Sequence, residues 1–250
     1  MTNDGGVSVR TENGVATITF FHPKGNSLPG RLLSELTDAV TVAGRDSSAR
    51  VLVLRSEGGG AFCAGASFSE LAAISDEAAG KKFFLGFANL ILAMIRCPKF
   101  IVTRVQGKTV GGGVGILAAS DYVIATSAAS VRLSELAVGI GPFVVGPAIE
   151  RKIGLASFAA LAVEAGWRDA RWAAAHGLYS AVHDSIEAAD AAVRELATRL
   201  AASNPEAMSR LKNVFWEGTG DWDTLLAERA ATSGKLVLSD FARKAIAAAS

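Results

Sequence analysis

Cysteine, histidine and long basic runs are all scarce in this sequence of 250 residues. It contains two cysteines, Cys63 and Cys97, and three histidines. Two cysteines are too few for a disulfide framework, and neither a CxxC pair nor a His/Cys cluster marks a metal site. The histidines lie far apart in the chain without the spacing of a catalytic triad. We therefore expect no bound metal and a reducing, cytoplasmic location.

The charge balance excludes a second group of functions. The chain has 25 Lys and Arg against 24 Asp and Glu, a formal net charge of +1. Without long basic runs, nothing indicates nucleic acid or an anionic membrane surface as a partner, so we expect a small molecule instead. The first six residues lack the pattern of a signal peptide, and no apolar run looks long enough to span a bilayer. We therefore expect no membrane association.

Half of the residues are hydrophobic, which is enough to build a large core. We therefore expect one domain with a helical extension rather than two independent domains. Apolar residues follow a strand-like pattern in some segments and a helical period in others, and the two kinds alternate along the first part of the chain. The expected strands are 15–20, 51–54, 100–105 and 122–125, and the expected helices are 30–42, 78–95 and 111–119.

From Pro147 onward the strand signals disappear. Helical patterns such as 188–202 and 221–238 take over. We therefore expect an α/β core over residues 1–146, followed by an α-helical region over residues 147–250 that caps the core or contacts neighbouring subunits.

Two glycine-rich turns and one acid are the candidate catalytic groups of this sequence. The turns are Phe62-Cys63-Ala64-Gly65-Ala66 and Gly111-Gly112-Gly113, and the acid is Glu135. Each turn can direct a backbone N–H at one oxygen, and two such donors form an oxyanion hole. A carboxylate beside this hole, in a site with little water, becomes a better base and can move a proton at carbon.

These motifs, in this order and spacing, resemble those of the enoyl-CoA hydratase/isomerase (crotonase) family. The similarity runs along nearly the whole chain. No single motif is specific, but the combination is. It rests on Phe62–Ala66, Gly111–Gly113, Asp121 and Leu133–Gly139, with further matches at Pro23–Leu28, Arg151–Gly154 and Ala174–Leu178.

The resemblance implies a crotonase-like (ββα)n spiral core with a C-terminal α-helical region. It implies an acyl-CoA thioester as substrate, with coenzyme A as part of the substrate and no separate cofactor. It also implies a homotrimer or a dimer of trimers. The hole is assigned to the N–H groups of Ala66 and Gly112, and the proton transfer to Glu135. The residues expected to bind substrate are Lys24, Ala64, Gly65, Gly111, Gly115, Leu136 and Phe143, with Lys235 and Lys244 as candidates for the phosphates.

The sequence departs from the best-known hydratases of this family at two positions. Those enzymes use two glutamates, and Gly115 stands where the first would be. Hydration must activate a water and supply a proton, which is easiest with two carboxylates, whereas isomerisation can use one base that takes and returns a proton. Both reactions stay open. Ser67 stands where many members have aspartate, which removes any role of that acid.

Two other functions are compatible with the sequence. One is a binding or assembly subunit for CoA thioesters that kept the hole and lost efficient catalysis with the missing acid. The other is a nicotinamide oxidoreductase, because residues 113–118 satisfy a GxGxxA pattern. That pattern alone is weak, and its glycines do not follow the first strand of a βαβ unit. Asp121 is expected to be structural, and Cys63 to pack as a small apolar group.

Overall fold

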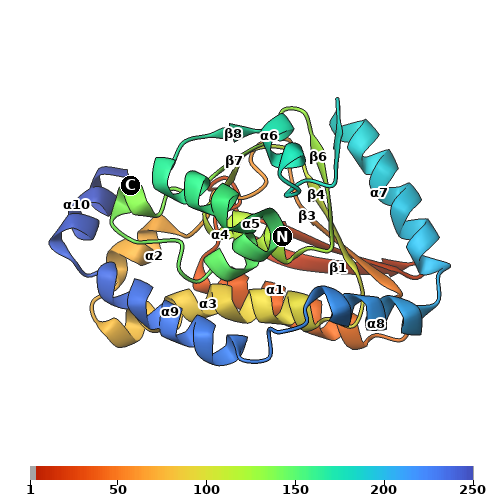
Figure 1. The fold of residues 1–250 in the computed structure, drawn as a ribbon, viewed down its shortest axis with the longest axis horizontal. Coiled ribbons are helices and arrows are strands. Elements are labelled where there is room, and N and C mark those ends of the chain that lie inside the picture. The colour runs from red at the N-terminus through yellow and green to blue at the C-terminus, as the bar shows by residue number, and fades with distance from the viewer. Residues whose placement is uncertain (1–3, 250) are drawn as a thin grey trace.

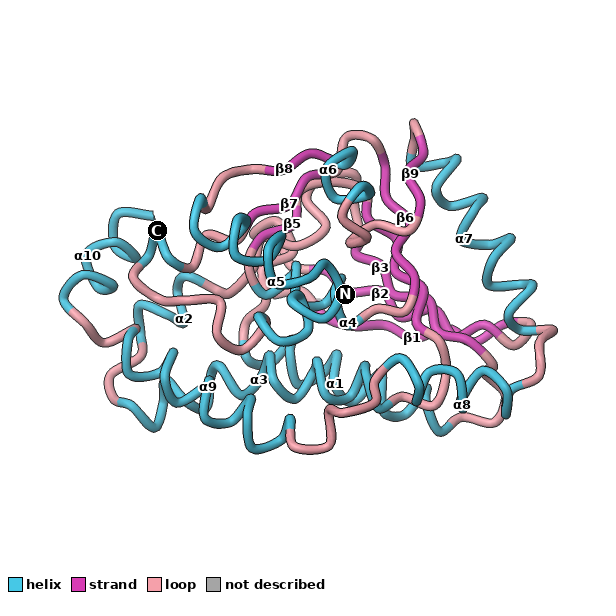
Figure 2. The backbone as a smooth tube through the Cα atoms, viewed as in Figure 1, coloured by secondary structure: helices cyan, strands magenta, loops and turns pink. Residues whose placement is uncertain are grey.

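A computed structural model describes residues 4–249. Its main sheet has six strands in the order β1-β2-β3-β4-β6-β9, in which β1 and β2 are antiparallel and the others parallel. A smaller sheet has the order β5-β7-β8 and lies to one side of the main sheet (Figure 2). The strands are β1 (Gly6–Glu12), β2 (Val15–Phe21), β3 (Val51–Ser56), β4 (Ile101–Val105), β5 (Thr109–Val110), β6 (Tyr122–Thr126), β7 (Ser130–Arg132), β8 (Arg168–Asp169) and β9 (Ala181–His183).

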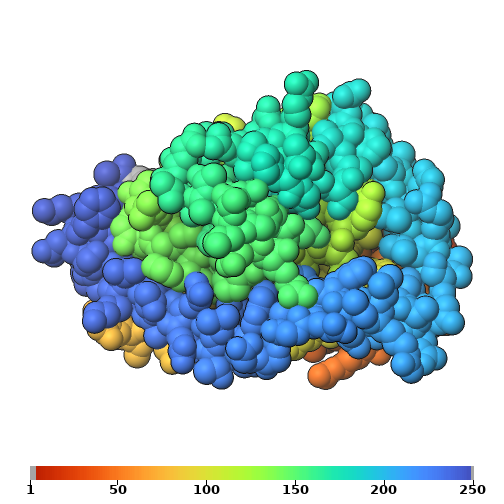
Figure 3. All heavy atoms as spheres, viewed as in Figure 1, coloured from red at the N-terminus to blue at the C-terminus, as the bar shows by residue number. Residues whose placement is uncertain are grey.

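Helices cover the main sheet and extend beyond one end of it (Figure 1). Helices α8 to α10 form a continuous band along the lower edge and the left end of the molecule (Figure 3). The helices are α1 (Gly30–Arg45), α2 (Phe68–Ala73), α3 (Glu77–Arg96), α4 (Gly112–Ala119), the 3₁₀ turn η1 (Leu136–Val138), α5 (Gly146–Glu164), α6 (Ala170–Ala175), α7 (Ile186–Ala201), α8 (Pro205–Phe215), α9 (Trp222–Leu236) and α10 (Asp240–Ala249).

The seven elements expected between residues 15 and 125 are all present, with ends shifted by a few residues. The apolar run of strand β3 is continuous because both faces of the strand are buried. Leu52 and Leu54 face the larger core, whereas Val51 and Val53 face a smaller core under α7. A strand buried on both faces cannot show the alternation of a half-exposed strand. This β3 run ends just before the first glycine-rich turn.

Two expectations from the sequence are wrong. Strands do occur after Pro147, because β8 pairs with β7 and β9 forms the edge of the main sheet beside β6. Both strands are short, with two and three residues, and so leave little pattern in the sequence. In addition, one helix of the described chain, α3, is long and apolar enough to cross a membrane by length and composition. Half of its apolar window is buried against the rest of the protein, as in a core helix.

Strand β1 was missed although the sequence contains its signal. Asn13 and Gly14 join β1 to β2 as a two-residue turn, and both have positive φ, at 49° and 78°. Asn-Gly is the preferred pair for such a hairpin turn because both residues tolerate that conformation.

Helices α3 and α9 approach each other at a pair of glycines. A Cβ placed on Gly80 would lie 2.6 Å from the carbonyl oxygen of Gly234. A Cβ on Gly234 would lie 2.4 Å from the backbone nitrogen of Lys81. The two backbones are therefore in direct contact, and no other residue type fits at either glycine without moving a helix.

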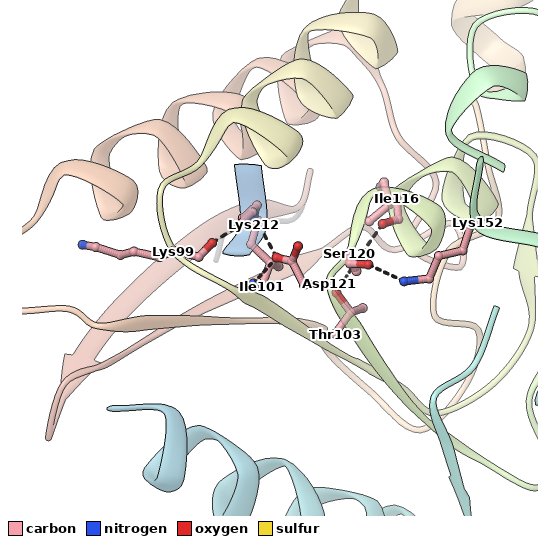
Figure 4. Close-up of polar contacts among 8 residues, drawn as sticks. All are labelled: Lys99, Ile101, Thr103, Ile116, Ser120, Asp121, Lys152 and Lys212. Atoms are coloured by element: carbon pink, nitrogen blue, oxygen red, sulfur yellow. Dashed lines mark hydrogen bonds and ion pairs between the residues drawn. The ribbon is translucent and has the colours of Figure 1, made fainter. Parts of the chain in front are cut away.

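A buried ion pair fastens α8 to the N-terminal ends of β4 and β6 (Figure 4). The ammonium of Lys212 donates to Oδ2 of Asp121 at 2.8 Å and to the carbonyl of Lys99 at 2.9 Å. The same carboxylate oxygen accepts the N–H of Ile101, the first residue of β4. Asp121 is therefore structural, as expected, but its cationic partner lies 91 residues away and was missed.

Replacing Lys212 with Met is expected to lower the free energy of unfolding by about 3–5 kcal/mol, because it leaves the Asp121 carboxylate buried without its counter-charge. The side chains of Lys212 and Asp121 are only 1% and 5% exposed. Chemical denaturation checks the value. The double variant Lys212→Met/Asp121→Asn is expected to recover part of the loss. Equal losses in the single and double variants would contradict this account.

Candidate active site

The first glycine-rich turn lies beyond the end of β3 and is held by backbone hydrogen bonds. Phe62 and Cys63 donate to the carbonyl of Lys108, and Leu28 donates to the carbonyl of Gly65. Gly65 has a φ of +87°, and a Cβ there would lie 3.1 Å from the carbonyl oxygen of Val110. The turn thus requires glycine at this position.

Cys63 supports this turn by packing. Its side chain is fully buried, and burial raises the pKa of its thiol to about 12. The expectation that Cys63 acts as a small apolar group is confirmed.

The second turn joins β5 to α4. Gly111 has a φ of +53°, and Gly112 is the first residue of α4. A Cβ on Gly112 would overlap the ring of Phe87, with only 2.1 Å to its nearest carbon. In the described part of the chain, no acceptor is found for the backbone N–H of Ala66 or of Gly112. Ala66 and Gly112 thus have free backbone N–H groups and both line one pocket. Gly112 also stands at a helix N-terminus, where negative charge is favoured.

Glu135 follows β7 and precedes the 3₁₀ turn η1. Its carboxylate lies against Gly111, since a Cβ on that glycine would be 3.0 Å from Oε1. Its Oε2 is fully shielded and has no hydrogen-bond partner among the described residues. Burial raises the pKa of Glu135 to about 7. A carboxyl group with this pKa can both take up and release a proton near neutral pH.

These groups line one apolar pocket with an empty volume of about 590 Å³, including its open mouth. Glu135 is the only ionisable side chain among the lining residues, and two serines supply the only side-chain hydroxyls. The lining residues are Ala64, Gly65, Ala66, Phe68, Leu71, Phe84, Phe87, Val110, Gly111, Gly112, Ser134, Glu135, Val138, Ile140, Gly141, Pro142, Phe143, Val144, Val145 and Ser233.

Most of the expected site residues meet at this pocket. The expected hole donors and acid line it, together with four of the seven residues expected to bind substrate. The binding residues are Ala64, Gly65, Gly111 and Phe143.

The other expected binding residues lie outside the lining. Lys24 is exposed, and Leu136 is 53% exposed. Gly115 is buried in α4, and a Cβ there would be 2.6 Å from Cγ1 of Val145. Lys235 and Lys244 are exposed on α9 and α10. The binding roles of the exposed residues stay predictions for parts of a ligand outside the pocket.

Several pocket residues could not be identified individually from the sequence. Phe84 and Phe87 come from α3, whose apolar pattern does not show which of its side chains reach a pocket. Ser233 comes from α9, almost 100 residues after Glu135 in the chain. Their positions follow from long-range packing, for which a local pattern contains no signal.

Ser67 and two histidines have structural roles in this region. The Ser67 hydroxyl accepts the N–H of Glu70 and caps α2. The ring of His22 contacts the Ser27 hydroxyl at 2.9 Å, and the ring of His176 stacks on Trp172. None of these side chains lines the pocket.

The raised pKa of Glu135 predicts a pH dependence of stability. In the folded protein the group holds its proton up to a pH of about 7, against an ordinary value of 4.5. The folded state therefore binds more protons between these values, and its stability falls as pH rises through this interval, by about 3 kcal/mol in total. Urea unfolding at pH 4.5 and pH 7.5 should show this fall in the parent beyond that in Glu135→Gln. Identical pH profiles would contradict it.

The chain is similar to a family model and to several known proteins that act on CoA thioesters. A family model described as enoyl-CoA hydratase/isomerase matches residues 10–243. The chain is similar to human methylglutaconyl-CoA hydratase, with 32% identity over 77% of this chain and 58% of the relative. It is also similar to a carnitinyl-CoA dehydratase of Proteus mirabilis, with 29% identity over 82% of this chain and 78% of the relative.

Another relative is a hexahydroindene-carboxyl-CoA hydrolase of Rhodococcus jostii, with 35% identity over 52% of this chain and 51% of the relative. The chain thus spans about half the length of the first curated relatives that it matches. Among solved structures, an enoyl-CoA hydratase of Bacillus halodurans has the same fold. The TM-score is 0.89 at 20% identity, over 97% of this chain and 99% of the other.

Proposed function

Because the chain belongs to the enoyl-CoA hydratase/isomerase family, we propose that it is an enzyme that moves a double bond in an enoyl-CoA thioester. One observation carries the proposal: a single shielded carboxylate lies in an apolar pocket beside two free backbone donors. The N–H groups of Ala66 and Gly112 would hold the thioester oxygen. Glu135 would transfer the proton.

One base is sufficient for both proton transfers of the isomerisation. Ionised Glu135 removes a proton from C2 of a 3-enoyl-CoA, and the electron pair moves toward the thioester oxygen, which gains negative charge. The two N–H donors stabilise that charge in surroundings of low polarity. Protonated Glu135 then returns the proton to C4, the double bond forms between C2 and C3, and the carboxylate is regenerated.

The surroundings of Gly115 support isomerisation over hydration. A Cβ at position 115 would lie 2.6 Å from Cγ1 of Val145 and 3.5 Å from Cδ1 of Ile91. The space that a side chain needs there is therefore occupied. Among the pocket-lining residues no second carboxylate is present to position a water. Hydration by Glu135 alone is the second candidate, favoured by the names of relatives such as the methylglutaconyl-CoA hydratase.

Restoring the second acid is expected to increase hydration. In the double variant Gly115→Glu/Val145→Gly, the missing side chain at 145 removes both overlaps, at 2.6 Å from Cγ1 and at 2.8 Å from Cβ. A second carboxylate can then hold a water, and we expect the ratio of hydration to isomerisation to rise about tenfold. The variant Gly115→Gln/Val145→Gly is the matched control because its amide is a poor base. An equal ratio in both variants would contradict the prediction.

The function is tested with trans-2-enoyl-CoA and cis-3-enoyl-CoA in deuterated water, with products resolved by mass spectrometry. Double-bond migration without added water, lost in Glu135→Ala, supports isomerisation. Formation of 3-hydroxyacyl-CoA, lost in the same variant, would replace it with hydration. Tight binding of both substrates without turnover would replace both with a binding or assembly subunit for CoA thioesters.

A further inference from the structure

We infer that the substrate carries an apolar acyl chain with no second acidic group. The inference rests on the proposed function, because it assumes that the thioester oxygen lies at Ala66 and Gly112 and places the acyl chain in the pocket beside them. It goes further by excluding the dicarboxylic class of acyl-CoA substrates.

The walls of the pocket are mainly hydrocarbon. Helix α2 supplies Phe68 and Leu71, and α3 supplies Phe84 and Phe87. The segment that follows η1 supplies Ile140 together with the ring of Phe143 and the two valines after it. An alkyl or alkenyl chain would exchange water for these surfaces at a gain that grows with the buried area.

Among the described residues that line the pocket, no cation can balance an acyl carboxylate. The lining residues include no Lys, Arg or His. When Glu135 is ionised, the hydroxyls of Ser134 and Ser233 are the only side-chain donors among the lining residues, and a hydroxyl supplies one hydrogen bond without a counter-charge. A carboxylate moved from water into this pocket would lose its hydration and gain little in return.

The negative charge of Glu135 would further oppose the binding of a second carboxylate. Glu135 must be ionised to act as a base, so a second carboxylate in the same pocket would face a like charge in surroundings of low polarity. Like charges in such surroundings repel more strongly than in water. Both the composition of the walls and the catalytic group therefore oppose an acidic acyl chain.

The test compares two saturated CoA esters of similar length, hexanoyl-CoA and glutaryl-CoA, by isothermal titration calorimetry at pH 8. Neither has a double bond to move, so binding is measured without turnover. We expect the Kd of glutaryl-CoA to be at least 100-fold higher. Values within threefold of each other would overturn the inference.

A variant that gains affinity for glutaryl-CoA provides a second test of the inference. Phe68 is half-buried at the pocket, so Phe68→Lys can place an ammonium there while its head stays partly hydrated. Phe68→Met is the matched control of similar length. We expect Phe68→Lys to bind glutaryl-CoA at least tenfold more tightly than Phe68→Met does. Equal, tight binding by the parent and both variants would overturn the inference.

The inference and the proposed function fail in different ways. Selective binding of hexanoyl-CoA without turnover of any enoyl-CoA would overturn the proposed reaction and support the apolar pocket. Normal double-bond migration with equal binding of the two esters would support the reaction and overturn the inference.

Discussion

The variant Glu135→Gln is expected to lower kcat for proton transfer by about 10³-fold, while the Kd for a saturated acyl-CoA changes by less than threefold. The amide keeps the size of the side chain and removes the basic oxygen, and general acid–base catalysis contributes typically 10²–10⁴-fold. Single-turnover measurements with a 3-enoyl-CoA, alongside titration with hexanoyl-CoA, separate the two effects. A variant that keeps full kcat would show that Glu135 does not move the proton.

The pH profile gives an independent check on the same group. Burial raises the pKa of Glu135 to about 7, and the base is active only when ionised. We therefore expect kcat/KM to fall about tenfold per pH unit below pH 7 and to level off above it. In Glu135→Gln the residual rate should lose this dependence. A profile that is flat from pH 5 to pH 8 in the parent would exclude Glu135 as the titrating group.

Removing the N–H of Gly112 is expected to lower kcat by 10²–10³-fold, the typical effect of losing one oxyanion-hole donor. Proline removes this N–H, and the first residue of a helix tolerates proline because its N–H has no partner within the helix. The ring of Phe87 must be shortened first, because any side chain at 112 would overlap it. The variant is therefore Gly112→Pro/Phe87→Ala.

The matched control is Gly112→Ala/Phe87→Ala. It has the same space at Phe87 and a side chain at 112, but it keeps the N–H. The ratio of the two kcat values then isolates the donor, and circular dichroism verifies that both variants fold alike. Similar kcat values in the two variants would show that Gly112 is needed only for its small size.

The larger elements of the fold could be predicted because they leave long patterns in the sequence. The 20 residues of α3 and the buried run of β3 are examples. The short strands β8 and β9 could not, because two or three residues acquire extended structure only by pairing with β7 and β6. The hairpin at Asn13-Gly14 could have been found from its turn residues alone.

Some residues of the candidate site could likewise be predicted from the sequence, and others could not. Gly65, Gly111 and Glu135 could be identified because local turn geometry and a nearby acid are visible in the sequence. The rings of Phe84 and Phe87 could not, because their place in the pocket depends on how α3 packs against α4 and α9. The side chain that fills the position of a second acid, Val145, was likewise invisible from the sequence.

The contact between Gly80 and Gly234 determines more than the packing of two helices. Helix α3 carries Phe84 and Phe87, one turn and two turns beyond Gly80, and α9 carries Ser233, directly beside Gly234. Because backbone touches backbone at the two glycines, the helices that carry these walls cannot pack closer together there. Any side chain larger than hydrogen at either glycine would therefore act as a spacer and widen the acyl pocket, without altering a single residue that lines it.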